Sequence, residues 1–375
     1  MLKNVLITGG AGFIGSSIAL KLVDKGYNVR VMDNLSPQIH GENASLPKKL
    51  IGKVDFIKGD VRSTKDWKRA IDGQNAVIHL AAETGTGQSM YEIFHYCDSN
   101  IGGTAKFMDI LANEKHSIKR VVIATSRAIY GEGMYRCKEH DLVYPEARND
   151  EDMAKGDFEC KCTICKKDVE ICKTKENTLI HPTSIYGITK QVQEQLVMVT
   201  CHSLGIPAIS FRYQNVYGPG QSLSNPYTGI ISIFSTRIRN GKDINIFEDG
   251  KESRDFVFID DVANITIEGL EREDITYESF NVGSGVMTSV NEVVEALELS
   301  YGKNVKIEIT GNYRVGDIRH NYADISKTEK LLGYKPMTDF KTGIKRFTDW
   351  VLTQDETNDG YEASLKEMED KGLLK

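Results

Sequence analysis

Short apolar segments alternate with amphipathic segments through the first two-thirds of the chain, and few folds accommodate such a pattern. The expected strands lie in residues 3–9, 28–33, 54–60, 76–82 and 120–126 and at the start of 206–218. Helical periodicity occupies residues 13–25, 65–71, 103–115 and 184–203. Apolar strands separated by helices indicate a parallel sheet that is covered on both faces. Right-handed crossovers then give a doubly wound α/β fold.

A glycine-rich turn joins the first expected strand to the first expected helix. The sequence ITGGAGFIG places Gly9, Gly12 and Gly15 three residues apart, and the strand–turn–helix context makes this spacing a signal of dinucleotide binding. We expect Gly9 to permit the tight turn, Gly12 to let the backbone approach a pyrophosphate, and Gly15 to let the helix pack closely on the sheet. A loop that binds no nucleotide is the alternative.

Two acidic residues follow the next expected strands. Asp33 ends the second strand, where a carboxylate binds the adenosine ribose hydroxyls and repels a 2′-phosphate, so NAD is favoured over NADP. Asp60 follows the third strand and either reaches the adenine or caps a helix. This part of the chain predicts a Rossmann-type NAD site formed by Gly9, Gly12, Phe13, Ile14, Gly15, Asp33, Asn34, Asp60 and Val61.

The pattern of elements changes after residue 215, where turn-rich segments separate shorter strands and helices. We expect an NAD-binding domain over residues 1–215 and a smaller substrate-binding lobe over residues 216–350. Residues 260–271 have the pattern of a helix that returns to the sheet, so the two parts should interleave. Residues 351–375 are charged, and we expect a tail that ends in a surface helix.

Composition excludes several classes of protein. With 40% hydrophobic residues and a formal net charge of −6, the 375-residue chain is too apolar and too weakly charged to be disordered over most of its length. No apolar run approaches the ~18 residues of a membrane span, and we expect no signal peptide and no membrane partner. The slight acidity disfavours nucleic acid as a partner. Seven cysteines, an odd number, favour a reducing compartment and a cytoplasmic location.

Tyr186 and Lys190 are four residues apart in the expected helix 184–203 and so share one face of it. The Lys190 ammonium and a positively charged nicotinamide would lower the pKa of the Tyr186 phenol, which is ordinarily near 10. Ser126 ends an expected strand, and the carboxyl ends of parallel strands are where such sheets hold ligands. Its hydroxyl can bind the substrate oxygen that Tyr186 protonates. Taken singly, these residues also fit ordinary core, surface and turn positions, but together they predict a catalytic set.

Five motifs in order strengthen this prediction. They are the glycine loop, Ser126 before IYG, Tyr186-x-x-x-Lys190, RYQNVYGPG at 212–220 and SRDFVFIDDV at 253–262. Together they resemble the extended short-chain dehydrogenase/reductases, the NAD-dependent nucleotide-sugar epimerases and dehydratases, over nearly all of residues 1–350. Within that family, the segments PQIHGE and GTGQSMYEI and a cysteine-bearing insertion are similar to the dTDP-L-rhamnose 4-epimerase-like proteins. The resemblance also implies a homodimer that packs through the helix carrying Tyr186.

The resemblance implies further site residues. His79 to Ala82, with Leu80 and Ala81 between them, and Asn100 would line the nicotinamide pocket. The loop that contains Glu83, Gly87, Gln88 and Ser89 would flank the sugar. Asn215, Arg254 and Arg314 would hold the diphosphate, and planar guanidinium groups suit phosphate chemically. Each arginine taken alone also fits a solvated surface position. Arg127 differs from the small residues expected beside the serine, and we place it with the substrate residues.

The residues after Ser126 favour one reaction over others. The 4,6-dehydratases of the family carry an Asp-Glu pair there, and a 3,5-epimerase carries a cysteine at the second position. This chain has Arg127 and Ala128, so neither dehydration nor 3,5-epimerisation is expected. We therefore predict a 4-epimerase that oxidises C4 of a nucleotide-diphosphate sugar and reduces it again on the opposite face. The alternatives are a 4-ketoreductase or dehydrogenase with net redox, a dehydratase, and a non-catalytic NAD-sensing protein.

The segment 131–180 is longer than the basic family plan and is rich in cysteine. Cys137-x-x-His140 is followed, after 21 intervening residues, by Cys162-x-x-Cys165. Four such ligands make the closed tetrahedral site of structural zinc. The rest of the segment is charged and turn-like, so a metal would compensate for a missing apolar core. Cys160 or Cys172 could replace His140, and free thiols without metal are the alternative.

Overall fold

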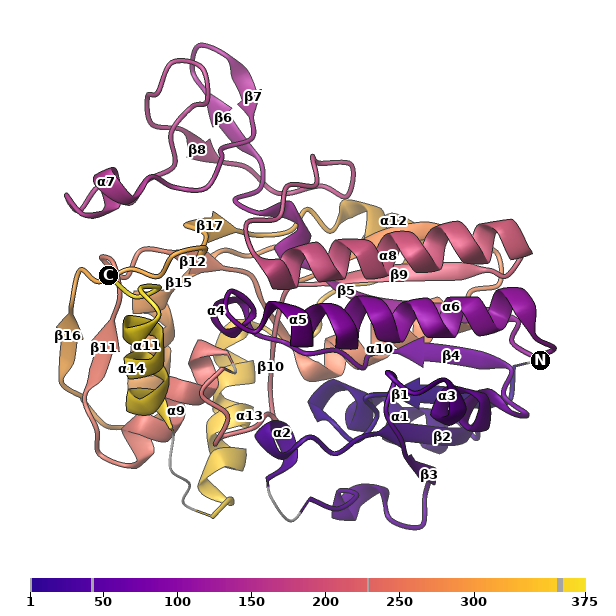
Figure 1. The fold of residues 1–375 in the computed structure, drawn as a ribbon. Coiled ribbons are helices and arrows are strands. Elements are labelled where there is room, and N and C mark those ends of the chain that lie inside the picture. Colours follow the sequence, from indigo (N-terminus) through magenta and orange to yellow (C-terminus); the bar gives the residue numbers. More distant parts are fainter. Residues whose placement is uncertain (1, 42–43, 228, 356–359) are drawn as a thin grey trace.

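The computed structural model describes residues 2–41, 44–227, 229–355 and 360–375, and its central element is a seven-stranded sheet (Figure 1). The strand order is β3–β2–β1–β4–β5–β9–β14, and all neighbouring strands run parallel. The strands are β1 (Asn4–Thr8), β2 (Asn28–Asp33), β3 (Asp55–Lys58), β4 (Ala76–His79), β5 (Arg120–Ser126), β9 (Ala208–Tyr213) and β14 (Glu278–Val282). The order reverses between β1 and β4, which confirms the predicted doubly wound fold.

Helices cover both faces of the sheet, as the apolar strands predicted. One face carries α1 (Phe13–Asp24), α10 (Ile259–Glu271) and α12 (Ser326–Leu332), and the other carries α3 (Thr64–Ile71), α6 (Gly103–Asn113) and α8 (Ile185–Leu204). Val5 and Ile7 of β1 belong to the core of the first face, whereas Leu6 belongs to the core of the second. The helix expected over residues 260–271 is α10, and it does return to the sheet beside α1.

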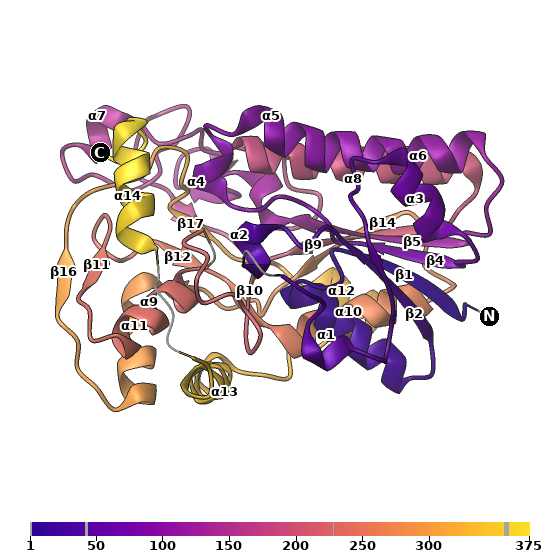
Figure 2. The same ribbon diagram turned by 60° about the horizontal axis from the view of Figure 1, so that its bottom comes forward.

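The smaller lobe has a separate core around three helices (Figure 2). The helices are α9 (Ile230–Arg239), α11 (Val290–Tyr301) and α13 (Phe340–Leu352). Short strands pair around them: β10 (Asn215–Tyr217) with β13 (Phe256–Phe258), β11 (Ile244–Ile246) with β16 (Ile307–Ile309), and β12 (Ser253–Arg254) with both β15 (Thr288–Ser289) and β17 (His320–Asn321). Among the described residues, no helix combines the length and apolar character that a bilayer span requires.

Residues 131–180 form a projection above the rest of the molecule (Figure 1). It contains β6 (Tyr135–Cys137), β7 (Asp141–Val143), α7 (Asp150–Met153) and β8 (Glu170–Ile171), and the three strands form one antiparallel sheet. Its small core includes three of the cysteines, Cys137, Cys160 and Cys162. We refer to residues 131–180 as the insertion.

The C-terminal segment is more closely packed than its charge led us to expect. The predicted boundary at residue 351 falls inside α13, and the terminal helix α14 (Tyr361–Asp370) buries Tyr361, Ser364 and Met368. The backbone N–H of Tyr313 donates to the carbonyl of Lys375 at 2.8 Å, which ties the chain end to the lobe. The tail thus ends in a helix, α14, in which three well-spaced residues bury one face and the charged residues occupy the rest.

A buried charged network fixes α8 against the sheet. Glu194 lies on α8, one turn after Lys190, and Arg212 lies on β9. Arg212 Nε donates to Glu194 Oε2 at 3.0 Å, and the Ser210 hydroxyl donates to the same oxygen at 2.7 Å. The two charged side chains are only 6% and 8% exposed. Because Tyr186 and Lys190 lie on α8, this network determines where they stand relative to the strand ends.

The substitution Arg212→Met is expected to lower the free energy of unfolding by about 3–5 kcal/mol, because Glu194 would keep a buried charge without its partner. Lys345→Met is the control, since Lys345 pairs with Asp349 on the exposed surface of α13 and should contribute less than about 1 kcal/mol. Urea denaturation measures the free energy of unfolding of both variants. Equal small losses in the two variants would contradict the proposed importance of the network.

Candidate active site

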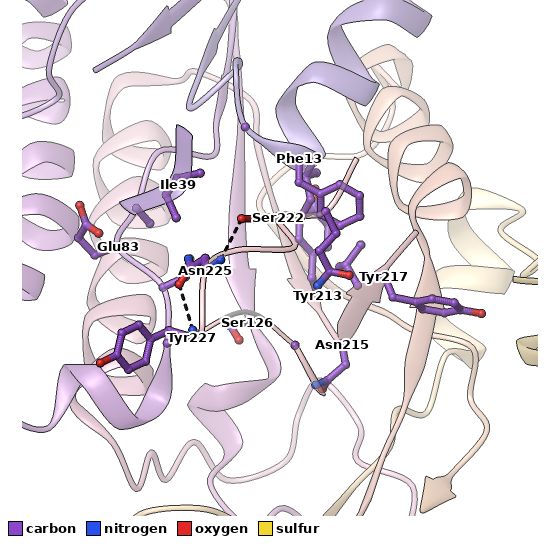
Figure 3. Close-up of a pocket in the computed structure, with 18 of the residues that line it drawn as sticks. Phe13, Ile39, Glu83, Ser126, Tyr213, Asn215, Tyr217, Ser222, Asn225 and Tyr227 are labelled. Carbon is purple, nitrogen blue, oxygen red and sulfur yellow. Dashed lines mark hydrogen bonds between the residues drawn. The ribbon is translucent and has the colours of Figure 1, made fainter. Parts of the chain in front are cut away.

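A cavity of about 910 Å³ lies at the carboxyl ends of the sheet strands and is closed on its other side by the smaller lobe. Figure 3 shows Phe13, Glu83, Ser126, Asn215 and Tyr227, from separate elements, around this space. All of the predicted catalytic, cofactor and substrate residues line it, except five: Asp60, His79, Gln88, Ser89 and Asn100. The topology therefore brings together residues that are far apart in the sequence.

The glycine loop has the geometry of a dinucleotide loop. Gly9 has a φ of +66°, and a Cβ there would lie 2.9 Å from Ala81 Cα, so a side chain is excluded. The backbone at Gly12 is extended, and no side chain in the described part of the chain caps α1 there. The amides of the first turn of α1 are thus available to an anion. A Cβ on Gly15 would lie 2.4 Å from the carbonyl oxygen of Gly9, so the absence of a side chain lets α1 pack closely against the residues that directly follow β1.

Asp33 is held at the cavity wall by the backbone. Its carboxylate accepts hydrogen bonds from the amides of Ala11 at 3.0 Å and Leu35 at 2.9 Å. Ala11 lies in the glycine loop, so the carboxylate connects that loop to the end of β2. This placement agrees with the role predicted for Asp33 at an adenosine ribose.

Asp60 does not line the cavity. Its carboxylate accepts from the Arg62 guanidinium at 2.7 Å and from the Asn34 amide at 3.3 Å, and these hydrogen bonds lower its pKa against the opposing effect of burial. Ser63, and not Asp60, caps α3, because its hydroxyl accepts from the amide of Asp66 at 3.2 Å. The capping alternative for Asp60 is therefore wrong, and its contact with adenine stays a prediction.

Tyr186 and Lys190 both face the cavity from α8, beside Ser126 at the end of β5. Burial raises the pKa of the Tyr186 phenol, whereas a hydrogen bond with Ser126 and the charge of Arg127 lower it. Burial also lowers the pKa of Lys190 to about 7, and its ammonium donates to the carbonyl of Ala124 at 3.1 Å. The sequence pointed to Lys190 as the cation that lowers the pKa of Tyr186. In the structure, Arg127 is a cation that has this effect.

Arginine side chains gather where the cavity meets the smaller lobe. Arg127 Nε donates to the Asn215 amide oxygen at 3.1 Å, and Arg254 donates only to backbone carbonyls, with distances of 2.7–2.9 Å. Arg314 pairs with Asp317 at 2.6 Å. No carboxylate of the described residues forms a salt bridge with Arg127 or Arg254. Burial and the nearby Arg254 lower the pKa of Arg127, against the opposing influence of Asp317, Tyr186 and Glu132.

Four predicted residues stand behind the wall and support it. Asn100 is fully buried, and its amide oxygen accepts from the backbone N–H of Glu83 at 2.7 Å, so it holds the loop after β4. The Ser89 hydroxyl accepts from the amide of Tyr186 at 3.1 Å and thus fixes the start of α8. Gln88 exchanges hydrogen bonds with Gln38 at 3.0 Å. His79 lies in the core between Thr8 and Thr104, and burial lowers its pKa to about 3.

Sequence reasoning missed several wall residues of the smaller lobe. Tyr227, Phe247, Glu252 and Tyr361 all line the cavity. Burial and the nearby Glu248 raise the pKa of Glu252 to about 7. Only Glu252 stood close to a recognised motif, two residues before Arg254. The others lie in turns and a terminal helix, whose sequences carry no spacing that points to a site.

The four predicted metal ligands converge in the insertion. Their ligand atoms all lie within 4.8 Å of one another. Cys137 Sγ is 3.7 Å from Cys165 Sγ, and His140 Nδ1 is 3.6 Å from the sulfurs of both Cys137 and Cys162. The backbone amide of Glu139 lowers the pKa of the Cys137 thiol to about 6, with a further contribution from His140.

The two spare cysteines of the insertion lie elsewhere. Cys160 is buried and hydrogen-bonded to the Tyr135 hydroxyl at 3.4 Å, and its thiol pKa is raised by burial. The Cys172 thiol lies 3.9 Å from the carbonyl oxygen of Glu170. The structure therefore keeps His140 in the cluster and leaves Cys160 and Cys172 outside it.

Comparison with known proteins identifies the family. The sequence matches the NAD dependent epimerase/dehydratase family over residues 5–152 and 161–283. This chain belongs to that family. A dTDP-L-rhamnose 4-epimerase from Burkholderia thailandensis is 37% identical over 356 residues, which cover 94% of this chain and 96% of that protein. A putative UDP-glucose 4-epimerase from Methanocaldococcus jannaschii is 32% identical and covers 94% of this chain and 100% of its own length.

Solved structures of related enzymes support the same family assignment. The UDP-glucuronic acid 4-epimerase from Bacillus cereus, in complex with UDP-glucuronic acid and NAD, matches this epimerase-family protein with a TM-score of 0.75. The two are 26% identical, and the match covers 93% of this chain and 99% of the other. These comparisons confirm the predicted family, the Rossmann-type fold and the enzyme class, an NAD-dependent epimerase of nucleotide sugars.

Replacing Arg127 by methionine should shift the rise of the epimerisation rate to higher pH. Removing the guanidinium removes a charge that lowers the pKa of Tyr186, so the phenol would lose its proton only at higher pH. The pH profile of kcat/KM measures the shift, and Arg127→Lys, which keeps the charge, is the control. An unchanged profile in the methionine variant would exclude this influence of Arg127.

Proposed function

We propose that this protein interconverts C4 epimers of a nucleotide-diphosphate sugar, with Ser126, Tyr186 and Lys190 as its catalytic residues. The observation that carries the proposal is that one cavity is lined by the glycine loop, by this trio and by three arginines, Arg127, Arg254 and Arg314. The residues before 216 form the NAD-binding part, and residues 216–350 with the tail from 351 supply the substrate side.

The first part of the cavity fits NAD. The uncapped first turn of α1 and the absence of a side chain at Gly12 leave room for a pyrophosphate against the backbone. Asp33, held by the amides of Ala11 and Leu35, would bind the adenosine ribose. NAD bound there supplies reversible hydride acceptance, which allows the sugar to be oxidised and reduced without net redox.

The trio then handles the proton of the sugar hydroxyl. Tyr186, as phenolate, removes the proton of the 4-hydroxyl, and Ser126 holds the same oxygen by a hydrogen bond. A charged Lys190 and Arg127 favour the phenolate form of Tyr186. The resulting 4-ketosugar turns about its diphosphate linkage while Arg254 and Arg314 hold the diphosphate. Reduction on the opposite face, with proton return from Tyr186, completes the epimerisation.

The groups beside Ser126 argue against dehydration. Elimination of water requires an acid and a base next to the sugar, and Arg127 and Ala128 supply neither. A 4-ketoreductase or dehydrogenase would use the same trio but would exchange its cofactor at each turnover. A non-catalytic NAD sensor would have no need of the Ser126–Tyr186 hydrogen bond.

The deciding experiment is to assay the purified protein for bound NAD(H) and to follow a panel of UDP- and dTDP-sugars by NMR. We expect retained NAD and interconversion of C4 epimers. Tyr186→Phe should lose about 10²–10⁴-fold in rate, because the phenol is the general acid and base. Tyr91→Phe, at a hydroxyl bonded to Tyr227 on the cavity mouth, is the matched control and should keep most of its activity. Net accumulation of NADH, or a Tyr186→Phe variant within about tenfold of wild type, would refute the assignment.

We also propose that Cys137, His140, Cys162 and Cys165 bind a structural zinc ion. A tetrahedral zinc with bonds of about 2.3 Å to sulfur and about 2.0 Å to nitrogen needs sulfur–sulfur separations of about 3.8 Å and sulfur–nitrogen separations of about 3.5 Å. The 3.7 Å and 3.6 Å separations in the insertion fit these values closely. The amides of Glu139 and Ile164 also donate to Cys137 and Cys162 sulfurs at 3.4 Å, which stabilises thiolates.

Elemental analysis of protein purified without an affinity tag tests the zinc proposal. We expect about one zinc per chain, lost in the Cys162→Ser/Cys165→Ser double variant together with a lower melting temperature, because four protein ligands make a closed site that stabilises the fold around it. Cys172→Ser, outside the cluster, is the control and should keep the metal. A metal-free wild-type protein of full stability would end the proposal.

The homodimer and the cytoplasmic location stay predictions. The exposed face of α8 carries Ile188, 42% exposed, and Val199, 70% exposed, and the neighbouring α5 (Ile93–Tyr96) carries Phe94, 82% exposed. An apolar face of this kind supports packing of two copies through the helix that bears Tyr186.

A further inference from the structure

A buried arginine of the insertion touches the wall of the substrate cavity from behind. Arg148 lies between β7 and α7, and its side chain is only 3% exposed. Its two terminal nitrogens donate to both carboxylate oxygens of Glu248 at 2.8 and 2.7 Å. One of them also donates to the backbone carbonyl of Asp317 at 3.0 Å. Glu248 and Asp317 are both wall residues of the cavity, and they come from separate segments of the chain.

A second arginine completes the connection from the side of the smaller lobe. Arg319 is 1% exposed and donates to Glu248 at 2.9 Å and to Glu159 of the insertion at 2.6 Å. Its backbone N–H donates to Glu132, also of the insertion, at 2.8 Å. The insertion therefore holds the cavity wall through buried, charge-assisted hydrogen bonds, which are strong and directional.

The two segments that Arg148 joins are the ones that position Arg314. Asp317 forms the ion pair with Arg314, and the ring of Phe247, next to Glu248, lies 5.3 Å from the Arg314 guanidinium. Glu248 itself has a φ of +51°, a backbone conformation that non-glycine residues keep only when their surroundings enforce it. Both oxygens of its side chain are bound by arginines, so Arg148 and Arg319 supply that enforcement.

We propose that Arg148 is a positioning residue for the diphosphate end of the substrate, and that the insertion thereby sets the affinity of the cavity for nucleoside diphosphates. This proposal rests on the proposed function, which assigns Arg314 to the diphosphate. Arg148 reaches no cavity surface itself; it fixes the Phe247–Glu248 turn and the Asp317 carbonyl relative to each other. A displacement of these groups by about 1 Å is enough to weaken binding and catalysis substantially.

The test measures the affinity of the NAD-containing protein for UDP and for dTDP by calorimetry. Arg148→Met should raise Kd for both by about tenfold or more. The NAD content should not change, since the hydrogen bonds of Arg148 go to Phe158, Glu248 and Asp317 and not to the glycine loop. Arg148→Lys keeps the charge but lacks the planar guanidinium group. Its affinity for the nucleotides should therefore lie between that of the wild type and that of Arg148→Met. In turnover, KM for the nucleotide sugar should rise more than kcat falls.

Two control arginines separate positioning from stability. Arg120 is 2% exposed and donates to the carbonyls of Gly269 and Ile275, away from the cavity, so Arg120→Met should lose stability but keep its affinity for UDP. Arg136 pairs with Asp141 on the surface of the insertion, and Arg136→Met should change neither property. An equal loss of affinity in Arg120→Met and Arg148→Met would overturn the proposal.

The remaining outcomes of the binding experiment also test the proposal. If wild-type protein binds neither UDP nor dTDP and converts no nucleotide sugar, the proposed function fails first. If wild type binds and Arg148→Met binds within about twofold of it, the role of Arg148 is refuted. Should the methionine variant not fold, Arg148→Lys and Glu248→Gln carry the test, and unchanged affinity in both would refute it equally.

Discussion

The ion pair between Glu194 and Arg212 is the interaction on which the geometry of the site depends. It lies in the core between α8 and β9, and further hydrogen bonds from Ser210 and Thr125 reach the same carboxylate. A helix packed only by apolar contacts can slide along a sheet at small cost, whereas a hydrogen-bonded charge pair fixes its register. The register of α8 in turn places the Tyr186 phenol beside Ser126 at the end of β5.

Two parts of the site would be stabilised by added charges of opposite sign. In the middle of the cavity, burial disfavours the charged forms of both Tyr186 and Lys190, so the reactive phenolate needs added positive charge. Next to it, Arg127 and Arg254 form no salt bridge with a carboxylate of the described residues, so the negative charge of a ligand would stabilise them. A substrate with a diphosphate at one end and a hydroxyl to be deprotonated near the middle satisfies both needs at once. These charges therefore support the proposed nucleotide-diphosphate sugar as the substrate.

The sequence was sufficient for features whose residues are close together in the chain. The glycine loop, the i and i+4 pair on α8 and the Cys-His halves of the insertion each occupy a few residues, and all three have the expected geometry. Features that depend on packing between distant segments were not accessible. Nothing in the sequence shows that Ser89 turns away from the cavity to hold the amide of Tyr186, or that Tyr361 of the charged tail reaches the wall.

In the proposed function, Arg127 would link substrate binding to acid–base chemistry. Its side chain is bonded to Asn215 on the diphosphate side, yet its charge also lowers the pKa of Tyr186. A diphosphate that neutralised Arg127 completely would therefore work against deprotonation of the phenol. We propose that Arg254 and Arg314 resolve this conflict, because they would hold the diphosphate and leave part of the field of Arg127 directed at Tyr186. The distance between phosphate and phenol would then depend on contacts that extend from Arg314 through Asp317 and Arg148 to Glu248 and the insertion.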